Sequence, residues 1–220
     1  MKKLILAIGL IVTSTFAYAQ LNGSGKTITK NFDYNNFDKV YFEDVNGKIE
    51  VEIGAKWSVS VTIDDNLESL LAFKENASEN ELTVYFKSNR NNRMYIESTN
   101  IKIKITMPEA SVIRNDGNAS LMVTGVLDRY FRLENYGNST SRVTGTADEL
   151  DLKNTGNGNV NLSDLKAKKA VITCRGNGNA TVNASDEIIA TVSGNGNVVN
   201  KGKASFDNRS SRTGNGNLLK

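Results

Sequence analysis

The chain has 220 residues, with 27 Lys and Arg against 24 Asp and Glu, no His, one Cys and one Pro. The absence of His excludes His-based general-base catalysis and removes the commonest metal ligand. A single Cys excludes an intramolecular disulfide and a Cys-rich zinc site. The nearly balanced charge gives no electrostatic footprint for nucleic acid, so we expect no nucleic-acid partner.

The first 19 residues have the pattern of a cleaved signal peptide. Two lysines at 2–3 precede an apolar run over 4–12, and Ala-Tyr-Ala at 17–19 is a small-x-small cleavage motif. The apolar run is short for a bilayer-spanning helix, and no later stretch is apolar enough to cross a membrane. We therefore expect a mature chain that begins at Gln20, has no membrane span after cleavage, and is exported to the periplasm, the cell surface or the extracellular space.

Residues 20–110 read as an elaborated N-terminal cap that includes the first, irregular coils of the fold. An Asp-Asn-rich segment at 64–66, followed by apolar residues at helical spacing up to Phe73, predicts one short N-capped helix. A polar loop is expected at 88–93. Strands are predicted where apolar and polar residues alternate, at 40–43, 48–53, 58–63, 81–86 and 101–105.

A Gly-Asn motif recurs six times in residues 111–220, and four of the copies read Gly-Asn-Gly-Asn. A single copy would indicate only a turn, whereas six copies at intervals of 18 to 20 residues indicate an internal repeat. The leading glycines are Gly117, Gly137, Gly156, Gly176, Gly194 and Gly214.

The residues between the motifs alternate with period two, so each unit predicts two short strands joined by a polar turn, as at 127–129 or 147–149. One unit cannot bury its own apolar stripe, but stacking equivalent strands at about 4.8 Å per coil can. The sequence therefore predicts an all-β fold, a right-handed parallel β-helix (β-solenoid). Residues 111–220 form its regular array, in one continuous body with the cap.

Parallel strands in register would place each motif asparagine over its counterpart in the next coil. Side-chain amides one strand spacing apart can hydrogen-bond along the stack. Glycine at the leading position supplies backbone conformations that a Cβ would penalise. The predicted structural ladder consists of Asn118, Asn138, Asn157, Asn177, Asn195 and Asn215.

The pattern as a whole resembles the bacterial head GIN domain family of autotransporter adhesins. The resemblance is carried by Phe-Asp-Lys-Val at 37–40, Val-Asn-Gly-Lys-Ile at 45–49 and the serial Gly-Asn-Gly-Asn units, and it covers about residues 32–217. It implies a right-handed β-helix similar in shape to pectin-lyase-like proteins, an envelope or extracellular location, and an adhesive role. It implies no binding residues, because the shared motif is structural.

No residue is assigned as catalytic, cofactor-binding or metal-binding, and no cofactor is expected. The glycine-rich copies lack the strand-to-helix context that phosphate binding needs. Cys174 falls in an inward column with Asn135, Asn154 and Val192, which indicates a small buried hydrophobe rather than a nucleophile. A basic turn over 166–169 is typical of a solvated face, and an anionic glycan or surface is the alternative partner.

Two functions stay open. The first is a non-catalytic exported module for adhesion, which binds a glycan, a surface or an envelope protein through a rigid β-helix. The alternative is a β-helix carbohydrate-active enzyme, a lyase or hydrolase, which requires Asp148, Asp151 and Glu134 to converge in a groove. The last coil is polar where the others are apolar, at 208–212. This difference either protects the end of the solenoid or leaves an edge for end-to-end pairing with a second copy.

Overall fold

The computed structural model describes residues 19–87 and 94–220. The expected signal peptide lies outside the described residues except for its last residue, and the polar loop expected at 88–93 lies outside them entirely. Both therefore stay predictions.

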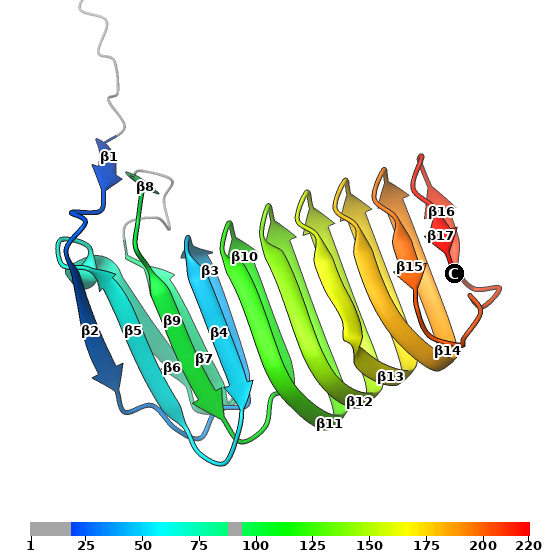
Figure 1. Ribbon diagram of the computed structural model, residues 1–220, viewed down its shortest axis with the longest axis horizontal. Helices are drawn as coiled ribbons and strands as arrows, with labels where there is room; N and C mark the ends of the chain where they lie inside the picture. The colour runs from blue at the N-terminus through cyan, green and yellow to red at the C-terminus, as the bar shows by residue number, and fades with distance from the viewer. Residues whose placement is uncertain (1–18, 88–93) are drawn as a thin grey trace, which may run out of the picture.

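Fifteen strands belong to one continuous sheet that winds into a flattened tube, and a separate parallel pair, β1 and β8, lies beside its N-terminal end (Figure 1). The strands are β1 (Ala19–Asn22), β2 (Thr27–Phe32), β3 (Lys39–Val45), β4 (Lys48–Ile53), β5 (Ser58–Asp64), β6 (Leu71–Asn76), β7 (Glu81–Phe86), β8 (Met94–Glu97), β9 (Lys102–Met107), β10 (Val112–Gly117), β11 (Ser120–Gly137), β12 (Thr140–Gly156), β13 (Val160–Gly176), β14 (Ala180–Gly194), β15 (Val198–Asn200), β16 (Ser211–Thr213) and β17 (Leu218–Leu219).

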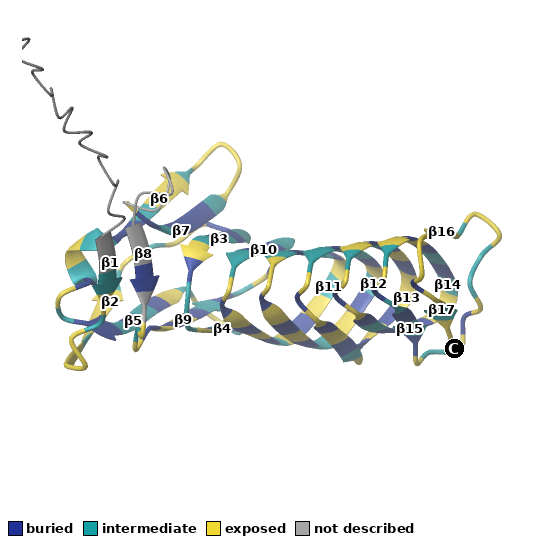
Figure 2. Cartoon of the chain, turned by 90° about the horizontal axis from the view of Figure 1, so that it is seen from above, coloured by how far each residue is buried: buried dark blue, intermediate teal, exposed yellow. Residues whose placement is uncertain are grey.

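The tube has two faces with the core between them. One face is made by β6, β7, β3, β10, the second halves of β11–β14, and β16. The other is made by β2, β5, β9, β4, the first halves of β11–β14, β15 and β17. Buried and exposed residues alternate along the strands (Figure 2). The predicted all-β solenoid is confirmed, whereas its right hand and the division at residue 110 stay predictions.

The four units between Gly117 and Gly194 each form one long strand of 15 to 18 residues rather than the two short strands that the sequence predicts, whereas the next unit forms the two short strands β15 and β16. The strand stays continuous because the residues expected in the polar turn still pair with the next coil. Leu127 lies opposite Thr146, and Asp128 lies opposite Ala147. The chain therefore bends through this edge of the tube without leaving the sheet, and it makes a sharp turn only at the Gly-Asn motif.

Aliphatic side chains stack into columns inside the tube. In one column, equivalent residues of successive coils face each other in register, and all of them are at most 1% exposed. Full burial of one such side chain contributes about 1.5 to 3 kcal/mol relative to exposure. The column runs through Val40, Ile113, Leu133, Leu152, Ile172 and Ala190.

Glycine is required in the Gly-Asn-Gly-Asn turn for two different reasons. Gly176 has φ +105°, a left-handed conformation that residues with a Cβ rarely adopt. Gly178 points inward, and a Cβ there would lie 2.0 Å from the carbonyl oxygen of Gly158 in the preceding coil. The turns of successive coils thus approach too closely for any other residue at this position.

The cap continues the parallel solenoid where it meets the repeats and contains antiparallel strand pairs farther from them. Strands β3 and β4 pair in parallel with β10 and β11, so they form a first coil. Outside that coil, β5 pairs antiparallel with β2 and β9, and β6 pairs antiparallel with β7. Four of the five strands predicted in this half lie within β3, β4, β5 and β7, and the fifth, predicted at 101–105, begins one residue before β9.

The short helix predicted after residues 64–66 is wrong. The chain there forms a single 3-10 turn, η1 (Glu68–Leu70), followed directly by β6. The expected capping side chains are engaged elsewhere: Asp65 accepts a hydrogen bond from the Ser24 hydroxyl at 2.7 Å, and Asn66 accepts one from the Ser24 amide at 2.9 Å. The turn therefore has no side-chain cap that would stabilise a helix, and the chain from Leu71 pairs with β7 instead.

Asp64 is fully buried and holds three segments of the cap together. Its carboxylate accepts hydrogen bonds from the amide of Gly25 at 2.9 Å, the amide of Asn100 at 2.6 Å and the side chain of Asn100 at 3.1 Å. Burial alone would raise the pKa of Asp64, but the donors of Asn100 and Gly25 outweigh it and hold the pKa below its usual value. The carboxylate is therefore stable in its charged form.

Replacing Asp64 by Asn should lower the free energy of unfolding by about 3 kcal/mol, because three donors lose a charged acceptor. Since the folded pKa is lowered, this stabilisation is present above about pH 4 and is lost as the pH falls through the folded pKa. Urea unfolding at a series of pH values measures the effect, with Asp33→Asn at an exposed site of the cap as control. Equal stability of the two variants at pH 7 would contradict this role of Asp64.

Candidate functional site

The motif asparagines form a continuous line of hydrogen bonds along one edge of the tube. Each side-chain amide donates to the Oδ1 of its counterpart in the preceding coil, at 2.7 to 3.2 Å. The line runs through Asn118, Asn138, Asn157, Asn177, Asn195 and Asn215, and these bonds lie on the exposed side of the turn.

A second amide ladder runs beside the first and was not predicted. Asn179 donates both its backbone and its side-chain N–H to the Oδ1 of Asn159, at 2.9 and 3.2 Å. Asn197 and Asn217 repeat this double contact in the next two coils. The signal was present in the sequence, because the last four motifs carry asparagine at their fourth position as well.

A third group of amides is buried inside the tube. Asn135 donates to the Oδ1 of Asn154 at 2.9 Å and accepts from the hydroxyls of Ser139 and Ser141, each at 2.6 Å. In the next coil this column continues with Cys174, which is 2% exposed. Burial raises the pKa of the Cys174 thiol to about 12, so the thiol stays protonated and unreactive.

The three acidic residues that an enzyme would need do not converge. Glu134 and Asp151 lie on the outer face of β11 and β12, where both contact the guanidinium of Arg132. Asp148 lies at the bend of the tube and pairs with Lys168 at 2.7 Å, a contact that lowers the pKa of Asp148. Each carboxylate is thus occupied by a neighbouring cation.

The same outer face carries an ordered group of aromatic and basic side chains. The guanidinium of Arg114 lies over the rings of Tyr136 and Tyr41, at 4.9 and 5.9 Å, and pairs with Asp116 at 3.0 Å. Partial burial is the largest cause that raises the pKa of both tyrosines, so their hydroxyls stay protonated at neutral pH.

Trp57 lies in the cap, where its indole N–H donates a hydrogen bond to the carbonyl of Phe37 at 2.9 Å.

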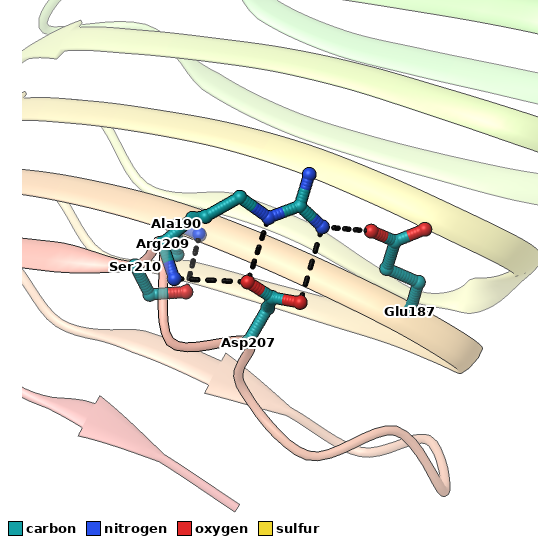
Figure 3. A network of polar contacts seen from close by, with 5 residues as sticks. All are labelled: Glu187, Ala190, Asp207, Arg209 and Ser210. Atoms are coloured by element: carbon teal, nitrogen blue, oxygen red, sulfur yellow. Dashed lines mark hydrogen bonds and ion pairs between the residues drawn. The ribbon is translucent and has the colours of Figure 1, made fainter.

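The polar residues of the last coil fasten it to β14. Arg209 contacts Glu187 of β14 and binds Asp207 through Nε and Nη2, at 2.7 and 3.1 Å (Figure 3). The hydrogen bonds from Arg209 lower the pKa of Asp207 to about 2. The Ser210 hydroxyl accepts the amide N–H of Ala190 at 3.1 Å. These side-chain contacts add to the short backbone pairing of β16 with β14.

A groove of about 890 Å³ follows the bent edge of the tube, opposite the asparagine edge. Its lining includes two rows of outward residues, which precede and follow the middle of each bend. The first row is Leu127, Thr146, Lys166, Asn183 and Lys201. The second row includes Arg129, Asp148, Lys168, Ser185 and Lys203.

A membrane-spanning helix and a metal-binding cluster are both absent from residues 19–87 and 94–220. No helix of this part of the chain is long and apolar enough to cross a membrane. No three His, Cys, Asp or Glu side chains there are placed to hold a metal ion.

The fold and its edges define a β-solenoid whose exposed polar residues are arranged in rows along the axis. The family described as "Putative auto-transporter adhesin, head GIN domain" matches residues 36–204. The chain belongs to this family, as the sequence pattern predicts. No curated protein matches the chain.

Solved structures of several bacterial proteins share the fold. A protein of Bacteroides fragilis described as a "putative adhesin" is 21% identical, with a TM-score of 0.68 over 90% of this chain and 99% of its own. A "Putative lipid binding protein" of Parabacteroides distasonis is 20% identical, with a TM-score of 0.54 over 91% and 99%. A "putative adhesin" of the same species is 19% identical, with a TM-score of 0.55 over 91% and 99%. At these identities the likeness shows the fold alone.

Replacing Asn177 by Ala should lower the free energy of unfolding by about 1 to 2 kcal/mol, because its amide takes part in two ladder bonds. Asn215→Ala removes the same side chain where it makes one such bond, so about half that loss is expected. Thermal or urea unfolding of both variants measures the difference. If the two variants lose equal stability, the ladder bonds are not what stabilises the edge.

Cys174 should resist thiol reagents in the folded protein, since its sulfur is buried and protonated. Labelling with a chromogenic disulfide at pH 8 should be slow in buffer and fast in concentrated guanidinium chloride. Rapid stoichiometric labelling without denaturant would show that the coil around Cys174 opens readily.

Proposed function

We propose that this protein is a non-catalytic adhesion module that binds an extended partner on a surface through its rigid solenoid. The signal-peptide pattern of residues 1–19 supports export to the envelope or beyond. Membership of the head GIN domain family supports an adhesive role. On this proposal, the same rigid solenoid extends away from its point of attachment and carries the binding surface.

The observation that carries the proposal is the register of the coils. Equivalent outward residues of β11–β14 lie opposite one another, so the outward positions form rows along the axis. Successive residues of one row lie about 4.8 Å apart, the spacing between neighbouring strands, so the rigid fold fixes the positions of the possible contacts before binding. A partner that is itself a repeating chain can then make several contacts without ordering flexible loops.

The experiment measures retention of the fluorescently labelled protein on intact cells of Bacteroides fragilis and on surfaces coated with their envelope extract. We expect saturable retention that unlabelled protein competes away. Serum albumin of the same labelling ratio is the control for non-specific adsorption. Retention no higher than that of albumin on every surface would contradict the proposed function.

A further inference from the structure

The groove at the bent edge is concave because small inward side chains lie between longer outward ones. At the bends of β12, β13 and β14 the middle residue is buried, whereas the residues on either side are more exposed; the middle residue of the β11 bend, Asp128, is only partly buried. The middle residues are small where the groove crosses β12 and β13: Ala147 and Ala167 are 5% and 3% exposed. In the last coil the equivalent residue is Gly202. Backbone therefore forms the floor, and the two rows of longer side chains form the walls.

Most cations of the groove form no ion pair with the residues that the structure describes. Its lining holds five basic side chains and two acidic ones. Lys168 pairs with Asp148 at 2.7 Å, while Arg129 acts on the same carboxylate only through a longer-range electrostatic interaction. The other four basic side chains form no ion pair within residues 19–87 and 94–220. They are Arg129, Lys166, Lys201 and Lys203.

This lack of pairing distinguishes the groove from the outer face of β10–β12. There Arg114 pairs with Asp116, Arg132 contacts Glu134, and Lys153 lies 3.6 Å from Glu134. Unpaired like charges held close together repel one another, so they favour a bound anion. The groove is therefore suited to attract a negatively charged ligand.

The cations recur on every second coil. In the first row, Lys166 is followed by the neutral Asn183 and then by Lys201. In the second row, Lys168 lies two coils beyond Arg129. With adjacent strands about 4.8 Å apart, successive cations of a row are about 9.6 Å apart. An extended polysaccharide with a carboxylate on alternate sugars presents its charges at a similar interval.

The remaining groove residues suit a sugar chain better than a lipid bilayer. Thr146, Asn183 and Ser185 offer groups that can hydrogen-bond to hydroxyls. Leu127, which is 79% exposed, offers an apolar contact for the C–H face of a ring. A flat bilayer surface cannot follow a floor that lies between two walls, whereas a single extended chain can.

We propose that this groove, which we call the basic groove, binds a linear polysaccharide bearing carboxylates, with the sugar chain parallel to the solenoid axis. This inference rests on the proposed adhesive function and names the class of its partner. Carboxylates lie against Lys166 and Lys201 on one wall and against Arg129 and Lys203 on the other.

The test is isothermal titration of the purified protein with hyaluronan oligosaccharides, which carry a carboxylate on alternate sugars. We expect binding that weakens as salt is raised, because exposed ion pairs are screened. The double variant Lys166→Glu/Lys201→Glu should bind about tenfold more weakly or worse, since each reversed charge costs on the order of 1 kcal/mol. Neutral dextran should not bind.

A matched control removes the same charge from the cap. Lys56→Glu/Lys74→Glu reverses two exposed lysines outside the groove, so its affinity for hyaluronan should stay within about twofold of the unchanged protein. Equal urea midpoints of the two double variants establish that both are folded. Equal loss of affinity in both variants would mean that net charge alone drives binding, and would overturn the proposal.

Two further outcomes also overturn it. One is binding of phosphatidylglycerol vesicles, lost in the groove variant, without binding of hyaluronan. The other is equal binding of dextran. If the protein is retained on cells or envelope extract but binds no acidic polysaccharide, the basic groove proposal fails and the adhesive function stands. If it is retained on no surface and binds no polysaccharide, both fail.

Discussion

Parallel pairing of successive coils in register is the constraint on which every other feature of this structure depends. The leading glycines of four consecutive coils lie directly opposite one another, from Gly137 through Gly156 and Gly176 to Gly194. A shift of one residue would turn the inward column of Leu133 and Leu152 toward solvent and expose its aliphatic surface. The same shift would break the amide ladders, because each amide would face a glycine.

Stacking like residues over one another suits amides and aliphatic groups, but it does not suit charges, which repel across adjacent strands. The chain resolves this conflict in two ways. On the outer face, opposite charges alternate along a row, as where Arg132 lies opposite Asp151 and Glu134 lies opposite Lys153. At the bend, a neutral residue separates cations of one sign, as where Asn183 lies between Lys166 and Lys201. The first solution neutralises a surface, and the second leaves a surface charged.

The repeating half of the fold could be predicted because period and motif give the same answer in every unit. The six glycine-led turns fix the register, and the alternation between them fixes which residues point inward. The cap could not be predicted in the same way, since its contacts join segments far apart in sequence. Asp64 illustrates this: its local sequence is that of a helix cap, but its partners are Gly25 and Asn100. Tertiary hydrogen bonds therefore override the local signal.

The candidate sites were predictable to different degrees. The positions of the first amide ladder followed from the motif, and the inward place of Cys174 followed from the alternation, whereas the second amide ladder was not predicted. The basic turn at 166–169 was visible in the sequence, but its partners in the groove were not. Arg129 and Lys203 lie on the same wall because the coils stack in register, four coils apart along the axis, although more than seventy residues separate them in sequence. Only the three-dimensional register reveals that these positions belong together.

Because each long strand pairs only with its two neighbours, a coil is an exchangeable module. An in-frame duplication or loss of 18 to 20 residues between equivalent glycines would restore the same partners on both sides of the junction. The tube can therefore become longer or shorter by whole coils during evolution. Any binding surface along its edge changes in length with it, and no new packing has to arise.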